Sequence, residues 1–158
     1  MMGFNEYINE GKKTKKEKVH KLSGVVLIYN NKILLVRPKK FRRQMSKWSI
    51  PKGHIENKMG KMKTALHELQ EESMIKLKKS IIKSSDRYVI RYFKAGANKI
   101  LTCYVVNIEQ DQLNVRLFND MILGNFLKNE TVEAGFFSKD DAAQIIEKYQ
   151  LELLKFLE

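Results

Sequence analysis

The hydrophobic pattern near the start of the chain predicts two consecutive strands. Apolar side chains, mostly β-branched or leucine, run almost unbroken through 24–29 and again through 32–37. Short runs of this kind are typical of strands whose two faces are both covered. The two asparagines between the runs tolerate positive φ, which favours a tight hairpin turn. We therefore expect order from Ser23 onward, and we expect Pro38 to end the hairpin because proline cannot donate to a sheet ladder.

A helical repeat follows in residues 60–73. Its apolar side chains recur at i, i+3, i+4 and i+7, which builds one stripe: Met62, Ala65, Leu66 and Leu69. Four further segments have β-like composition: 75–82, 87–93, 100–108 and 132–137. A last helix is expected after Ser138, a candidate N-cap, because helical spacing of apolar residues continues to Leu157.

Strands around a central helix predict one α+β domain over residues 23–158, with a mixed β-sheet and helices packed on its faces. Residues 1–22 are rich in lysine and lack apolar periodicity, which favours a separate N-terminal arm. Two interpretations of this basic arm stay open, a mobile solvated segment or a phosphate-binding one. The apolar residues of segment 111–129 have no clear period, and this segment is either an insertion that determines specificity or a part of the packed core.

Charge adds information about partners. The chain has 158 residues and a net charge of +12, and thirteen basic residues against one acidic residue lie between Lys12 and Lys47. Since basic and acidic residues cancel in the rest of the chain, this stretch points to an anionic partner: a phosphate-rich small molecule, nucleic acid or an acidic surface.

Cysteine content and hydropathy exclude other classes. The one cysteine, Cys103, rules out a disulfide framework and a cysteine-based zinc site, and its apolar neighbours predict a buried, inert thiol. No apolar stretch approaches the ~18 residues that a membrane span needs, and no signal peptide is recognisable at the start. We expect a cytoplasmic protein without a membrane partner.

Three glutamates on the predicted helix are the candidate chemistry. Glu68, Glu71 and Glu72 are spaced i, i+3 and i+4, so they share one helix face and repel one another. A cation would compensate, and Mg²⁺ prefers oxygen ligands from one or two carboxylates together with substrate phosphates. The alternative is a solvated acidic face balanced by nearby lysines.

The surrounding sequence resembles the signature of the Nudix hydrolase family, G-x5-E-x7-R-E-U-x-E-E-x-G-U, where U is aliphatic. The chain matches it at six positions: Gly53, Glu68, Leu69, Glu71, Glu72 and Ile75. It departs at three, with Met59 for Glu, His67 for Arg and Met74 for Gly. The preceding Trp48-x-x-Pro51-Lys52-Gly53-His54-x-Glu56 is similar to the dinucleoside-polyphosphate and diphosphoinositol-polyphosphate branch.

The resemblance implies an α/β/α sandwich and a pyrophosphohydrolase that needs Mg²⁺, with Mn²⁺ as a substitute. Glu68, Glu71 and Glu72 would be catalytic and would hold the metal with the carbonyl of Gly53. The substrate would be a nucleoside diphosphate linked to another group, with a dinucleoside polyphosphate favoured. The departures bear on rate and substrate alignment more than on reaction type.

Other residues take supporting roles in this interpretation. Basic side chains are expected to bind substrate phosphates: Arg37, Lys39, Lys52, Arg42 and Arg43. Later loop acids are candidates for the general base: Glu130 and Glu133. Among the aromatic residues of the 87–93 strand, Phe93 is expected in the core, whereas Tyr88 and Tyr92 share a face.

Two alternative functions remain. The basic stretch fits an RNA 5′-end pyrophosphohydrolase or mRNA-decapping enzyme, with RNA as the partner. The three departures from the signature fit a Nudix-like protein that binds a nucleotide without cleaving it.

Overall fold

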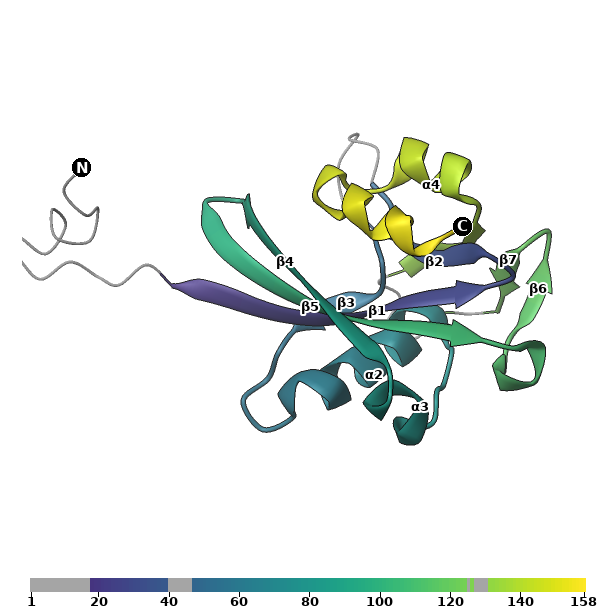
Figure 1. The fold of residues 1–158 in the computed structure, drawn as a ribbon, viewed down its shortest axis with the longest axis horizontal. Coiled ribbons are helices and arrows are strands. Elements are labelled where there is room, and N and C mark those ends of the chain that lie inside the picture. The colour runs from purple at the N-terminus through teal and green to yellow at the C-terminus, as the bar shows by residue number, and fades with distance from the viewer. Residues whose placement is uncertain (1–17, 40–46, 125, 127–130) are drawn as a thin grey trace, which may run out of the picture.

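The structure, a computed structural model, describes residues 18–39, 47–124, 126 and 131–158. Within these ranges the strands form one mixed sheet in the order β4-β5-β1-β2-β8-β7-β6, with β3 paired to β1 (Figure 1). The strands are β1 (Val19–Tyr29), β2 (Lys32–Pro38), β3 (Lys52–His54), β4 (Asp86–Lys94), β5 (Ala97–Ile108), β6 (Arg116–Phe118), β7 (Met121–Leu123) and β8 (Thr131–Phe137). The helices are α2 (Gly60–Ser73), α3 (Lys79–Lys83) and α4 (Lys139–Ile145), with 3₁₀ segments η1 (Gln110–Gln112) and η3 (Lys148–Phe156).

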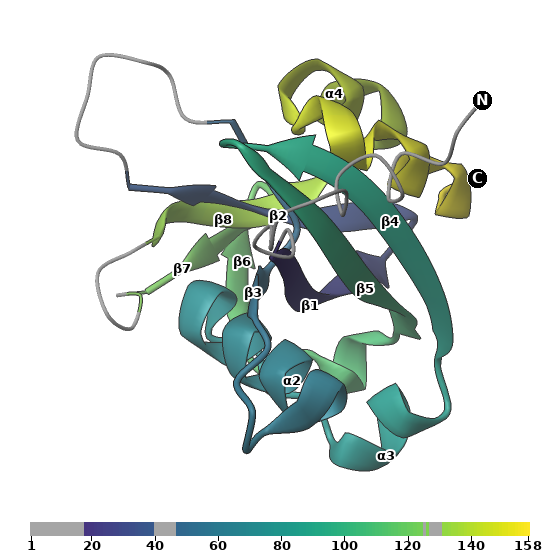
Figure 2. The ribbon, with the colours of Figure 1, turned by 90° about the vertical axis from the view of Figure 1, so that its left-hand side faces the viewer.

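Helices cover both faces of the sheet, as Figures 1 and 2 show. Alternate residues of β1 point into two separate cores. Val25 and Leu27 pack with Ala65 and Leu69 of α2, whereas Val26 packs with the apolar side chains of α4 and η3. This arrangement confirms the predicted α/β/α sandwich with a mixed sheet.

Strand β1 lies inside the sheet and changes partners along one edge. It runs parallel to β5 over its whole length, and β3 pairs with it at Leu22–Gly24. Near its end it forms the predicted hairpin with β2, in which Asn30 and Asn31 have φ of 51° and 56°. The positive φ angles confirm the turn chemistry of the two asparagines. The change of partner leaves room between β2 and β3 for the connection that carries residues 47–51.

The segment 75–82 is not the strand that its composition predicts. Met74 ends α2 with φ of 70°, and the chain then passes through an extended stretch into α3. Ile75 and Ile82 are both buried in the core beside α2. Their burial satisfies the apolar pattern without a place in the sheet, which is why the pattern was misleading.

The predicted C-terminal helix is interrupted. Ser138 caps α4 as expected, with its Oγ accepting the Asp141 N–H at 3.3 Å. The helix ends at Ile145 because the backbone of Trp48 inserts there. Its N–H donates to the Ile145 carbonyl (3.1 Å), and its carbonyl accepts the Glu147 N–H (2.9 Å). The rest of the segment is the 3₁₀ stretch η3.

Two further expectations need correction. Order in the sheet begins at Val19 rather than Ser23, because residues 19–22 pair with β5. Phe93 is not in the core but is 68% exposed. It faces the α2 side of β4, an edge strand, beyond the area that the helices cover. No helix in the described ranges is long and apolar enough to cross a membrane.

Candidate active site

Helix α2 sets the predicted glutamates against strand β3. The apolar stripe of the helix is buried on the sheet through Ala65 and Leu69, so its orientation is fixed by the core. The three glutamates lie on the flank of this stripe and are partly buried. The helix therefore presents Glu68 and Glu72 to the backbone of residues 52 and 53.

Glu68 lies directly against Gly53. A Cβ built on Gly53 would be 1.9 Å from Oε1 of Glu68 and 2.3 Å from its Cδ. The carboxylate therefore occupies the space that any side chain at position 53 would need. This close approach explains in physical terms why the signature position carries glycine.

The other two glutamates have different partners. One turn further along the helix, Oε1 of Glu72 accepts the backbone N–H of Lys52 at 3.3 Å. Oε1 of Glu71 lies 2.7 Å from Nε2 of His67, and the Glu71 side chain is only 11% exposed. Two carboxylates thus contact consecutive residues of β3, and the third is held from within the helix.

The structure shows what each departure from the signature does locally. Met59 is the N-cap of α2 and makes no side-chain hydrogen bond there. His67, in place of arginine, contacts Glu71. Met74 adopts the left-handed conformation, with its N–H donating to the Gln70 carbonyl at 2.8 Å. For a residue other than glycine this conformation costs roughly 1–2 kcal/mol.

Lys52 is the basic residue nearest to these carboxylates. Burial lowers the pKa of its ammonium group, and the neighbouring Lys94 and Lys99 lower it further, whereas Glu72 and Glu147 oppose the shift. Burial thus weakens the preference of this lysine for its charged form, and a further anion nearby would strengthen it. The site is therefore electrostatically suited to a negatively charged ligand.

A small cavity joins this lysine to the glutamate helix. Its volume is about 110 Å³, and its lining comes from β2, β3, β8, α2 and the connection before β3: Val36, Pro38, Ser49, Lys52, Glu72 and Thr131. The cavity thus lies where β1 changes partner between β2 and β3. It is large enough for a few atoms of a ligand in contact with both Lys52 and Glu72.

Gln150 positions the connection that leads into Lys52, and the sequence interpretation missed it. This side chain is fully buried. Its Oε1 accepts the Ile50 N–H at 2.9 Å, and its Nε2 donates to Ser49 Oγ and to the Tyr149 hydroxyl, both at 2.9 Å. A glutamine within the apolar C-terminal repeat was the one available signal, but its partners Ser49 and Ile50 lie about 100 residues away.

Two of the remaining predicted residues, Arg37 and Glu133, lie apart from the glutamates. Arg37 and Glu133 are cross-strand neighbours on β2 and β8, paired with 2.9 Å between Nη2 and Oε2. The pair is on the side of Trp48, opposite to Val36 and Ala134, which pack toward α2. Lys39 is exposed at the end of β2. Three predicted residues lie outside the described ranges: Arg42, Arg43 and Glu130.

The oxygen donors beside Gly53 fit a magnesium ion whose coordination shell is completed by substrate phosphates. In the described part of the chain, no group of three or more His, Cys, Asp or Glu side chains is placed to hold a metal ion by itself. Glu68 and Glu72 nevertheless bring two carboxylates to one short stretch of β3. Hard oxygen donors in this number, with substrate phosphates, are a common Mg²⁺ environment.

A carboxylate-bearing helix packed on a glycine in an α/β/α sandwich defines a class of hydrolase. The model of the NUDIX domain family matches residues 19–157. The chain therefore belongs to this family and is a Nudix hydrolase, an enzyme that acts on phosphoanhydride bonds. None of the curated protein sequences matches the chain.

Solved structures with the same fold are distant in sequence. The C. elegans Ap4A hydrolase binary complex is 17% identical with a TM-score of 0.63, over 86% of this chain and 93% of that one. The MutT NUDIX hydrolase from Burkholderia pseudomallei is 17% identical with a TM-score of 0.65, over 88% and 98%. A bifunctional NMN adenylyltransferase/ADP ribose pyrophosphatase from Francisella tularensis, complexed with AMP and a Mn ion, is 14% identical with a TM-score of 0.70, over 90% and 42%.

Proposed function

We propose that this protein is a Mg²⁺-dependent pyrophosphohydrolase of the cytoplasm that cleaves a nucleoside diphosphate linked to another group. A dinucleoside polyphosphate is the favoured substrate class. The observation that carries the proposal is the contact of Glu68 and Glu72 with the backbone of Lys52 and Gly53. The likeness to an Ap4A hydrolase and an ADP ribose pyrophosphatase agrees with a substrate of this type.

In this proposal Glu68, Glu71 and Glu72, together with the carbonyl of Gly53, hold the metal. When bound, Mg²⁺ supplies charge neutralisation on the phosphate oxygens and lowers the pKa of bound water. Lys52 donates to a phosphate oxygen in the adjoining cavity, and the phosphate in turn stabilises its charged form. Positioning and charge stabilisation of this kind account for most of the catalysis that phosphoryl transfer needs.

We place the general base among the α2 glutamates rather than at Glu133. Glu133 is engaged by Arg37 on the opposite face of the sheet from α2. A carboxylate held there does not face the proposed phosphate position. Glu130 lies outside the described residues and stays a prediction.

A substrate panel tests the proposal. The purified protein with Mg²⁺ is incubated with diadenosine polyphosphates, ADP-ribose, nucleoside triphosphates, an inositol pyrophosphate, and triphosphorylated or capped short RNA, and the products are identified by mass. We expect cleavage of a dinucleoside polyphosphate that Glu72→Gln abolishes. Cleavage of the RNA 5′ end alone would establish the RNA alternative. No cleavage of any compound by the folded protein would favour a nucleotide-binding role.

A further inference from the structure

The sheet has a face that the described helices leave uncovered, at the end where β4, β5 and β1 lie side by side. Register places Arg91 and Lys21 on either side of Ile100 in one row across the three strands. The next row outward holds Phe93, Asn98 and Val19. Registered neighbours point to the same face of a sheet, so these two rows form one continuous surface.

This surface is basic. A groove of about 240 Å³ lies on it between the strands and the start of α2, lined by Lys21, Ile55, Lys61, Val89, Arg91, Ile100 and Thr102. We call this the sheet groove. Its three charged side chains are all cations and come from three different elements. Within the described ranges, no acidic side chain forms an ion pair with Lys21, Lys61 or Arg91.

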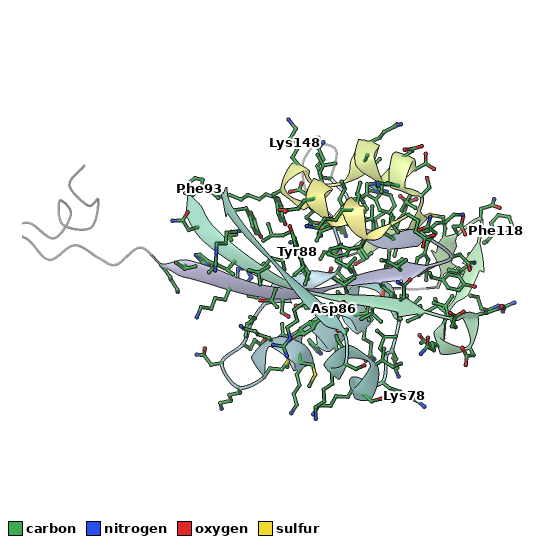
Figure 3. The ribbon with its side chains drawn as sticks, viewed as in Figure 1. Lys78, Asp86, Tyr88, Phe93, Phe118 and Lys148 are labelled. Atoms are coloured by element: carbon green, nitrogen blue, oxygen red, sulfur yellow. The ribbon has the colours of Figure 1, made fainter. Side chains whose placement is uncertain are left out.

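The same surface carries apolar side chains whose exposure to water is unfavourable. Phe93 is 68% exposed, Val89 47% and Val19 42%, which makes them three of the most exposed large apolar residues of the described chain. Figure 3 shows Phe93 at the end of the β4–β5 hairpin, close to where β1 begins. An exposed aromatic ring beside cations that form no ion pair with the described acids suits a ligand that has both phosphates and flat rings.

We propose that the sheet groove binds single-stranded nucleic acid, with Lys21, Lys61 and Arg91 on backbone phosphates and Phe93 stacked on a base. A groove of 240 Å³ is below the roughly 300–1,000 Å³ of sites that enclose a whole small ligand, so it fits a segment of a polymer. A duplex would hide its base faces from Phe93, whereas a single strand exposes them.

The groove is separate from the proposed catalytic residues. Lys61 lies at the start of α2, and Glu68 follows seven residues later, which is about 10 Å along a helix axis. Binding in the sheet groove therefore does not require the carboxylates. We expect Glu72→Gln to bind nucleic acid like the wild type, so failure of the hydrolase proposal and failure of this one give different results.

Fluorescence anisotropy with a 5′-hydroxyl 12-nucleotide RNA, and DNA of the same sequence, tests the proposal across a salt series. The 5′-hydroxyl end removes the phosphates that the hydrolase site would take. The variant Lys21→Ala/Lys61→Ala/Arg91→Ala should bind more weakly, with its salt slope reduced by about 2, since each single-strand phosphate contact contributes about 0.7. Phe93→Ala should lose at least about 5-fold in affinity with an unchanged salt slope.

A matched control removes three charges elsewhere. Lys78→Ala/Lys79→Ala/Lys83→Ala changes exposed lysines at α3, and Figure 3 shows Lys78 far from Phe93. This control should keep most of the affinity. Equal losses in the two triple variants would overturn the proposal in favour of diffuse charge, as would an unchanged affinity in Phe93→Ala or no binding by the wild type. All the changed residues are exposed, and thermal unfolding confirms that each variant is folded.

Discussion

Substitution of Gly53 by alanine tests the geometry beneath the proposed chemistry. The new Cβ would start 1.9 Å from Oε1 of Glu68, whereas ordinary van der Waals contact begins near 3.4 Å. The carboxylate must therefore move by about 1.5 Å. Gly53 is not among the positive-φ residues, so its backbone accepts alanine without strain. Because a misplacement of ~1 Å can cost about 100-fold in rate, we expect kcat/KM to fall by about that factor.

Stability should respond differently from activity. Glu68 can adopt another rotamer at a cost of about 1 kcal/mol, so the free energy of unfolding of Gly53→Ala should fall by no more than that. Gly96→Ala is the converse control: nothing lies within 4 Å of its Cβ, but its φ of 75° is unfavourable for alanine. It should lose about 1–2 kcal/mol of stability and keep its activity. Urea unfolding and steady-state kinetics measure both variants, and wild-type kcat/KM in Gly53→Ala would refute the reasoning.

Three further predictions concern the surroundings of the site. Gln150→Leu leaves the Ile50 N–H buried without its acceptor and removes the donor to the Ser49 hydroxyl, so urea unfolding should show a loss of about 2–4 kcal/mol. A loss below about 0.5 kcal/mol, roughly half the net value of one hydrogen bond, would contradict this. Burial lowers the pKa of Lys52, and a bound phosphate raises it again. Calorimetry should therefore show that tripolyphosphate binds with proton uptake and that its affinity declines as pH rises through the lowered pKa. Lys52→Met should remove this pH dependence. Burial raises the pKa of Cys103 to about 12, so a thiol reagent at pH ~8 should label the native protein far more slowly than the urea-unfolded one, and equal rates would show that the thiol is accessible.

Local patterns were sufficient for much of the fold and for the helix of the site. The apolar repeat of residues 60–73 matches α2, and the two asparagines form the turn that their tolerance of positive φ predicts. The glutamate spacing placed Glu68 and Glu72 on one helix face, which the structure turns toward β3. These features depend on residues close together in the sequence, so propensity and periodicity decide them.

Features that depend on distant partners were beyond the sequence. The α4 helix stops because Trp48, about 100 residues earlier, takes up its backbone groups. Arg37 and Glu133 were assigned separate roles, yet the register of β2 and β8 makes them partners of each other. Phe93 is aromatic and apolar like a core residue, but its exposure follows from how far the helices extend over the sheet. Long-range pairing of this kind leaves no local pattern to interpret.

The measurement that tests the account most directly compares hydrolysis of a dinucleoside polyphosphate by two variants in Mg²⁺. Glu72→Gln removes a charge that contacts β3 at the proposed site. Asp140→Asn removes a charge from an exposed acid in the first turn of α4, on the other face of the sheet. We predict a loss of more than about 100-fold in kcat/KM for Glu72→Gln and wild-type activity for Asp140→Asn. Equal activity of the two variants would contradict a catalytic site on α2.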